Sequence, residues 1–205
     1  MRKSRFPTHR SKQTERAPVS GPSHLICKEY TAVIKETIGA IALIVENIPK
    51  QLTERPQWVC WRLEERDDKE TKVPYTPGTL RRASSTDLMT WRTFSEALGA
   101  YGRSEPPYDG IGYAFCSADP FVGIDLDKCR DPEDGEITEW AQKIIDRVQE
   151  GYIEVSPSGR GIHVIVEGTA RGGGMRKKVR VNEEVVGEIE MYSRERFFTI
   201  TGEVL

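Results

Sequence analysis

The stretch FVGIDLD, residues 121–127, constrains the fold of this 205-residue chain more than any other. It is apolar except for two carboxylates, Asp125 and Asp127. Residues two apart on a β-strand project from the same face, so both carboxylates point one way while Ile124 and Leu126 point the other. Two like charges are costly to remove from water unless a cation compensates. The pattern indicates either solvent-facing acids at a sheet edge or a site for Mg²⁺ or Mn²⁺, which prefer carboxylate oxygens.

A second acidic pair favours the metal site. Glu188 and Glu190, in GEIEMY, also share one strand face. If this strand lies beside residues 121–127, three or four carboxylates converge, and such a cluster is hard to stabilise without metal.

His163, in GIHVIV, follows the turn SPSGRG, whose small residues allow backbone N–H groups to approach a phosphate. A lone strand histidine is more often structural. Metal-binding acids, a histidine beside such a turn and nearby cations nevertheless match what nucleotidyl transfer requires.

The remaining pattern predicts many short strands and few helices. Strands outnumber helices and follow one another in pairs, which favours an α+β fold with a largely antiparallel sheet. The Gly-rich, basic residues 169–183 are expected to form a mobile connection. Expected strands cover 58–64, 72–75, 111–116, 121–127, 152–156, 161–168, 185–192 and 196–202, the last two paired as a hairpin, and expected helices cover 30–48, 90–101 and 137–149.

The chain divides into three expected regions. Residues 1–29 form a basic, polar tail that we expect to be disordered. Residues 30–54 form an extension with a helix, and residues 55–205 form the main folded domain. The formal net charge of −2 does not by itself predict nucleic-acid binding. The local basic runs either contact phosphates or are merely solvated.

Other sequence features exclude several classes of protein. The four cysteines include no CxxC pair, so we expect neither a structural zinc site nor a disulfide framework. The longest apolar run, residues 39–45, is much shorter than the roughly 20 residues that span a bilayer. No signal peptide is evident, so a cytoplasmic protein without membrane contact is expected.

Three motifs in order, GIDLD, SPSGRGIH and EIEMY, resemble those of the archaeo-eukaryotic primase superfamily, in particular the catalytic domain of phage and plasmid primase-polymerases. The flanking KVPY, WRTFSEAL, YDGIGYAF and RFFTITG match as well, over roughly residues 55–205. The resemblance implies a sheet like that of an RNA-recognition motif (RRM) with flanking helices. It also implies a small N-terminal α/β unit, with the active site between the two.

The resemblance also implies roles for individual residues. Asp125, Asp127 and Glu190 would be the catalytic ligands of two Mg²⁺ or Mn²⁺ ions. Glu190 stands where many relatives have Asp, and it is preferred to Glu188 because its strand continues as the family pattern does. The incoming NTP or dNTP would be contacted by His163, Ser158, Arg160, Lys72 and Arg196. Independently of the resemblance, the Gly-rich basic run that contains Arg176, Lys177 and Lys178 predicts a flexible grip on the single-stranded DNA template or the triphosphate.

The implied activity is template-directed synthesis or extension of primers in phage- or plasmid-type replication. Relatives are commonly fused to a helicase, and because the chain stops soon after the third motif, a separate replicative helicase is an expected partner. A stand-alone domain, a fragment of a split protein and a degraded remnant stay open.

Two other functions compete with this one. The first is a non-catalytic module that binds single-stranded DNA or nucleotide. A nucleotide-sugar glycosyltransferase would also use a DxD motif, but the context of His163 and Glu190 disfavours it.

Overall fold

The computed structural model describes residues 43–205 apart from residues 104, 106, 171 and 173. It is an α+β fold of two antiparallel sheets with few helices, which confirms the predicted class. The expected tail at 1–29 and most of the expected helix at 30–48 lie outside the described residues. The described end of that helix was predicted wrongly, because it forms the 3₁₀ turn η1 (Val45–Asn47).

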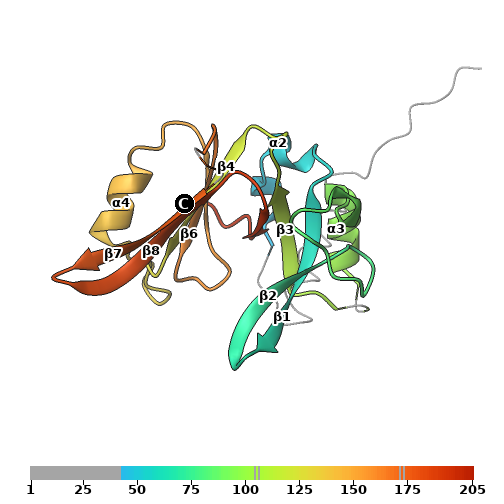
Figure 1. Cartoon of the computed structure of the whole chain (residues 1–205), viewed down its shortest axis with the longest axis horizontal. Helices are drawn as coiled ribbons and strands as arrows, with labels where there is room; N and C mark the ends of the chain where they lie inside the picture. Colours follow the sequence, from blue (N-terminus) through green and yellow to red (C-terminus); the bar gives the residue numbers. More distant parts are fainter. Residues whose placement is uncertain (1–42, 104, 106, 171, 173) are drawn as a thin grey trace, which may run out of the picture.

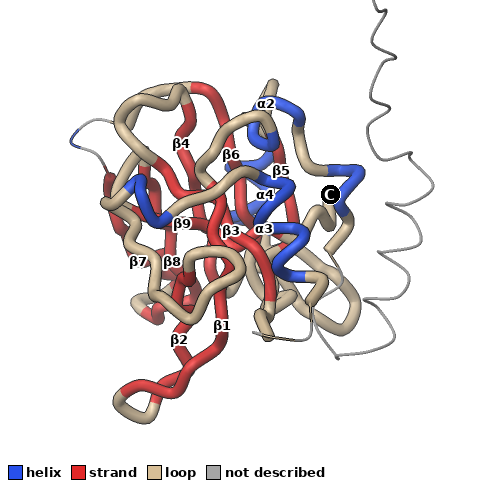
Figure 2. Tube along the Cα trace, turned by 90° about the vertical axis from the view of Figure 1, so that its right-hand side faces the viewer, coloured by secondary structure: helices blue, strands red, loops and turns tan. Residues whose placement is uncertain are grey.

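The first sheet has the order β2-β1-β3-β9 and joins distant parts of the chain. Its strands are β1 (Trp58–Arg66), β2 (Lys69–Tyr75), β3 (Gly110–Phe115) and β9 (Arg196–Ile200). The β1–β2 hairpin projects beyond the body of the molecule (Figure 2).

Short helices accompany this sheet: α2 (Lys50–Thr53), the 3₁₀ helix η2 (Leu88–Thr90) and α3 (Phe94–Tyr101). The predicted helix at 90–101 begins later, at Phe94, because Thr93 and Glu96 form a capping box there. In Figure 1, α3 lies on the outer side of the sheet.

The second sheet has the order β5-β6-β4-β8-β7 and carries the predicted motifs. Its outer face packs against α4 (Glu139–Ile145), where Leu126, Ile162, Val164 and Ala141 form a core cluster. The helix is shorter than the predicted 137–149, since Ile137 bridges to Arg130 in extended conformation. The strands are β4 (Phe121–Asp127), β5 (Tyr152–Val155), β6 (Ile162–Glu167), β7 (Gly174–Val181) and β8 (Glu184–Tyr192).

The predicted hairpin between residues 185–192 and 196–202 is wrong. β8 pairs with β4 and β7, whereas β9 pairs with β3 in the other sheet. The apolar side chains of Phe198 and Ile200 account for this, because they are buried in the core between the sheets.

The predicted mobile connection at 169–183 is also wrong, since residues 174–181 form β7. A tight turn at Asn182 and Glu183, both with positive φ, returns the chain into β8. Arg176 and Lys178 of β7 thereby lie opposite acids of β8, which stabilises this pairing.

The main core lies between the two sheets and includes residues of the N-terminal extension. Leu43, Ile48 and Leu52 belong to the same cluster as Trp58 of β1 and Phe121 of β4. Residues 43–54 therefore contribute side chains to the main core. None of the helices in the described part of the chain combines the length and apolar character that a membrane span requires.

Candidate active site

One row of side chains crosses the five-stranded sheet at Asp125. Strand register places Glu154 of β5 opposite His163 of β6, and His163 opposite Asp125 of β4. Asp125 is in turn opposite Glu190 of β8, and Glu190 is opposite Arg176 of β7. Residues in register project from the same face, so all five side chains share the face turned away from α4. The two acidic motifs thus converge, as expected if their strands are neighbours.

A second, shorter row lies two residues along the same strands. It consists of Asp127, Glu188 and Lys178, again in register. Leu126 and Ile189 lie between the rows and point to the opposite face. The face therefore carries four neighbouring carboxylates from two adjacent strands.

The carboxylate of Asp125 is held in a low-dielectric environment. Its side chain is 32% exposed. Burial raises the pKa of Asp125, with opposing attraction from His163 and Lys72 and added repulsion from Asp127 and Glu190. Because burial and the repulsion from neighbouring acids both disfavour its negative charge, the Asp125 carboxyl requires cationic partners to stay ionised.

Arg176 supplies one such partner. Its Nε lies 2.6 Å from Glu188 Oε1 and 2.8 Å from Glu190 Oε1, and a terminal guanidinium nitrogen lies 2.6 Å from Glu188 Oε2. Within the described residues, no three Asp, Glu, His or Cys side chains are arranged to hold a metal ion. The guanidinium instead neutralises the acids of β8.

His163 is fixed between two acids. Its Nδ1 lies 3.1 Å from Glu154 Oε1, and its Nε2 lies 3.9 Å from Asp125 Oδ1. The ring packs on Phe198 of β9, with centroids 5.0 Å apart. One ring nitrogen therefore faces the interior and the other faces the acidic row.

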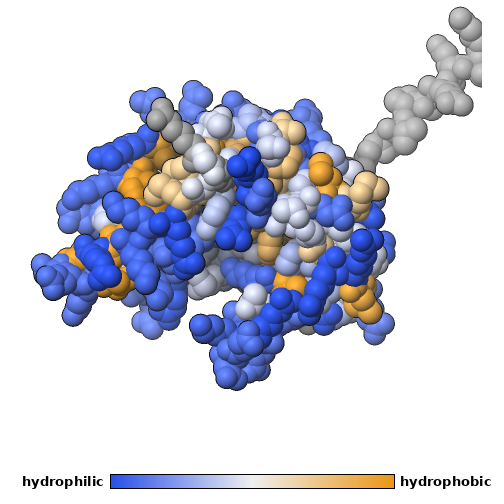
Figure 3. All heavy atoms as spheres, in the orientation of Figure 1, coloured by the Kyte–Doolittle hydropathy of each residue, from blue (hydrophilic) through white to orange (hydrophobic). Residues whose placement is uncertain are grey.

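The first sheet contributes two of the predicted cations. Lys72 Nζ lies 3.5 Å from Thr199 Oγ1. Burial lowers the pKa of Lys72, while the charges of Asp125, Asp127 and Glu154 act in the opposite direction, so the ammonium lies close to the acidic row. Hydrophilic side chains border the hollow between the two sheets (Figure 3).

Arg196 reaches the row less directly. Its guanidinium carbon lies 4.8 Å from the ring centroid of Tyr192, whose hydroxyl donates to Glu190 Oε2 at 2.8 Å. The predicted cation at position 196 is therefore linked to Glu190 through one aromatic ring.

The predicted phosphate-binding turn lies at the end of β4. Ser158 and Arg160 are exposed in the connection between β5 and β6. A Cβ at Gly161 would lie 2.9 Å from the carbonyl oxygen of Leu126 and 3.7 Å from Asp127 Cα. Glycine at 161 thus allows the turn to rest against the strand that carries the acids.

The structure separates the three basic residues that were predicted to act as one flexible grip. Arg176 and Lys178 lie on the acidic face, whereas Lys177 is in register with Ile189 and points to the opposite face. Because residues 174–179 of β7 pair with β8 in regular register, adjacent side chains among them point to opposite faces.

Sequence reasoning missed two features of the site. It gave no role to Glu154, although a carboxylate inside the apolar strand YIEV was a usable signal. It also did not place Arg176 beside the acids of β8, because the pairing of β7 with β8 was not recognised.

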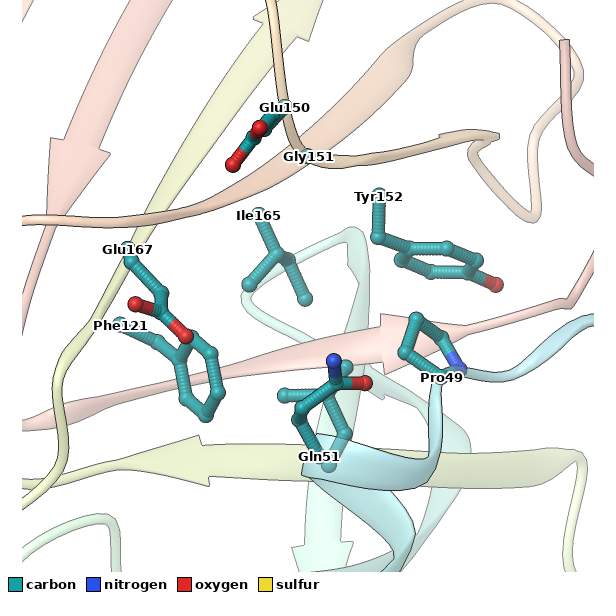
Figure 4. A pocket seen from close by; sticks show the side chains of 9 residues that line it. Pro49, Gln51, Phe121, Glu150, Gly151, Tyr152, Ile165 and Glu167 are labelled. Carbon is teal, nitrogen blue, oxygen red and sulfur yellow. The ribbon is translucent and has the colours of Figure 1, made fainter.

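A separate cavity of about 410 Å³ lies beside α2 (Figure 4). Phe121, Tyr152 and Ile165 line it, and Glu150 and Glu167 also border it. It contains none of the predicted site residues, and its carboxylates disfavour an anionic nucleotide.

The sequence of the chain is similar to that of a known phage protein. No family model matches the chain. Over 166 residues, the chain is 37% identical to the DNA primase-polymerase of Nitratiruptor phage NrS-1. The chain is related to a phage primase-polymerase. The match covers 78% of the chain but only 21% of the phage protein, so the chain spans about a fifth of its relative's length. The predicted resemblance to phage primase-polymerases is confirmed.

Proposed function

We propose that residues 55–205 are a primase-polymerase catalytic domain that joins NTPs or dNTPs on a single-stranded DNA template. The observation that carries this proposal is the register of β4 and β8, which sets Asp125 opposite Glu190 and beside His163. The similarity to a phage DNA primase-polymerase supports the same reaction. In this proposal the five-stranded sheet with α4 is the RRM-like unit, and the first sheet is the small N-terminal unit.

Asp125, Asp127 and Glu190 are the proposed ligands of a divalent ion. Their oxygens suit hard Mg²⁺ or Mn²⁺, and their crowding on one half-buried face fits a compensating cation. When bound, such ions stabilise negative charge on the attacking and leaving oxygens of phosphoryl transfer. Glu190 would first exchange the guanidinium of Arg176 for the ion.

Side chains of the chain itself would hold the nucleotide. His163 Nε2 and Lys72 flank the carboxylates from opposite sheets and would contact the triphosphate. Ser158 and Arg160, in the turn beside Asp127, would contact the same group, and Arg196 would approach from β9. Holding the triphosphate against the acids orients its α-phosphate toward the attacking hydroxyl, which is the main protein contribution in this type of reaction.

Template contacts are proposed for the edge strand β7. Lys177 and Lys178 present charge on both of its faces and can approach phosphates from the sheet edge. A replicative helicase is also proposed as a partner.

The test is incorporation of labelled nucleotide on single-stranded DNA, with and without a primer, by the purified chain. We expect product with Mg²⁺ or Mn²⁺ and none with chelator. Parallel reactions with NTPs and dNTPs define the preferred substrate. Tight, salt-sensitive DNA binding without product under any metal would contradict the enzyme and support the alternative of a non-catalytic DNA-binding module. The pairing of Arg176 with Glu188 and Glu190 is the observation that favours that alternative.

Replacing Arg176 should strengthen metal binding. Arg176→Gln removes the guanidinium that competes for Glu190, so we expect the Kd for Mn²⁺ to fall several-fold in calorimetric titration. Arg180→Gln is the matched control, because Arg180 lies on the same strand but contacts the Glu183 carbonyl oxygen. Equal Mn²⁺ affinity in both variants would show that Arg176 does not compete with metal.

A further inference from the structure

The carboxylate of Glu154 lies beneath His163 and is completely buried. It is the end of the row that crosses the sheet, on the side away from Arg176. Its Oε1 lies at hydrogen-bond distance, 3.1 Å, from Nδ1 of His163. Although burial raises the pKa of Glu154, its hydrogen bonds with His163 and Tyr152 leave that pKa lowered, so the group is a buried anion.

The other oxygen of Glu154 is held by groups that fix its position. Backbone N–H groups of Thr201 and Gly202 both donate to Oε2 at 2.9 Å, and the Tyr152 hydroxyl lies 2.6 Å away. Backbone N–H groups can only donate, so this oxygen must remain an acceptor. Oε1 is therefore the oxygen left to serve His163.

This arrangement determines which nitrogen of His163 carries its proton. Nδ1 must donate to the carboxylate, so in the neutral ring the proton lies on Nδ1 and Nε2 is bare. Nε2 is the nitrogen that faces Asp125 and the proposed nucleotide site.

We propose that Glu154 is a positioning residue, which orients the ring of His163, fixes its proton on Nδ1 and directs Nε2 toward the proposed nucleotide site. The nucleotide part of this inference rests on the proposed function. The orientation of the ring rests on the hydrogen bonds alone.

Thr201 and Gly202, whose backbone N–H groups hold Glu154, are also bonded to the N-terminal segment. Ile44 N donates to the carbonyl oxygen of Thr201 at 2.8 Å, and the Asn47 side-chain amide donates to that of Gly202 at 2.9 Å. The residues that hold Glu154 are thus themselves held by residues 44–47. This part of the extension supports the position of His163.

The test uses Glu154→Gln. The side-chain carbonyl must still face the backbone donors of Thr201 and Gly202, so the amide NH₂ faces His163 and donates to Nδ1. In the neutral ring the proton should then move to Nε2. Nitrogen-15 NMR of labelled histidine reads this directly, and the only other histidines, at positions 9 and 24, can be replaced by Gln in every sample.

The wild-type chain should show a protonated Nδ1, and Glu154→Gln a protonated Nε2. Titration with dATP should shift the Nε2 signal of the wild type, and the Kd for dATP should rise about tenfold in the variant, as expected when one hydrogen-bonding contact of the site is altered. Tyr152→Phe is the control, because it perturbs the same carboxylate but keeps its bond to His163. It should leave the tautomer unchanged.

The same tautomer in wild type and Glu154→Gln would overturn the inference, as would a wild-type Nε2 signal that dATP does not shift. A tautomer change with weaker dATP binding supports it even in a chain that incorporates no nucleotide. In that case the proposed catalytic function alone would fail.

Discussion

Asp125→Asn should reduce nucleotide incorporation to background while leaving the fold intact. The amide matches the carboxylate in shape, but it lacks the negative charge that opposes a divalent ion in the row with Glu190. Asp125 also lies next to His163, so the change affects both proposed parts of the site. Incorporation on primed single-stranded DNA with Mn²⁺ measures this loss.

The stability of the same variant separates catalysis from folding. Repulsion and burial already disfavour the charge at 125, so without metal the melting temperature should stay equal or rise. Glu184→Gln is the control for removing an acid, since Glu184 is exposed on β8, away from both rows. Substantial incorporation by Asp125→Asn would remove Asp125 from the proposed catalytic set.

Gly202→Ala should destabilise the chain by about 3–5 kcal/mol. Gly202 has φ +74°, and a Cβ there would overlap the carbonyl oxygen of Ile44. The strained backbone costs about 1–2 kcal/mol. Displacing Ile44 or Asn47 also breaks the hydrogen bonds that these residues make to 201–202, each worth about 1 kcal/mol. Urea unfolding followed by circular dichroism measures the difference.

Gly78→Ala isolates the backbone-strain part of this effect. Gly78 has φ +75°, nearly the same as Gly202, but a Cβ there meets no atom within 4 Å. We therefore expect a loss of only about 1–2 kcal/mol. Equal losses at the two positions would mean that contact with Ile44 does not stabilise the fold.

Local alternation was enough to predict the faces of the strands that carry the acids. Asp125 and Asp127 share one face and Leu126 the other, because the strand period of two does not depend on the rest of the fold. The apolar stripe of α4 was readable for the same reason, although its ends were not, since Ile137 is fixed by a bridge to Arg130.

The pairing of strands that are distant in the sequence could not be predicted from local alternation. Residues 196–200 have the composition of a hairpin partner for β8, yet they pair with β3, because Phe198 is buried between the sheets and packs on Phe115. β7 was mistaken for a loop because its side chains are nearly all exposed and carry no apolar alternation. The hydrogen bond between Glu154 and His163 differs from these cases, because β5 and β6 are consecutive strands and the carboxylate inside YIEV was a usable signal.

The central claim is that Asp125 and Glu190 hold one divalent ion together. Its most direct test is calorimetric titration of Mn²⁺ into wild type, Asp125→Asn, Glu190→Gln and the double variant. Each single substitution should weaken Mn²⁺ binding at least about tenfold, and the double variant should be little worse than either, because both act on one ion. Mn²⁺ binding of wild-type affinity in the double variant would contradict a shared ion.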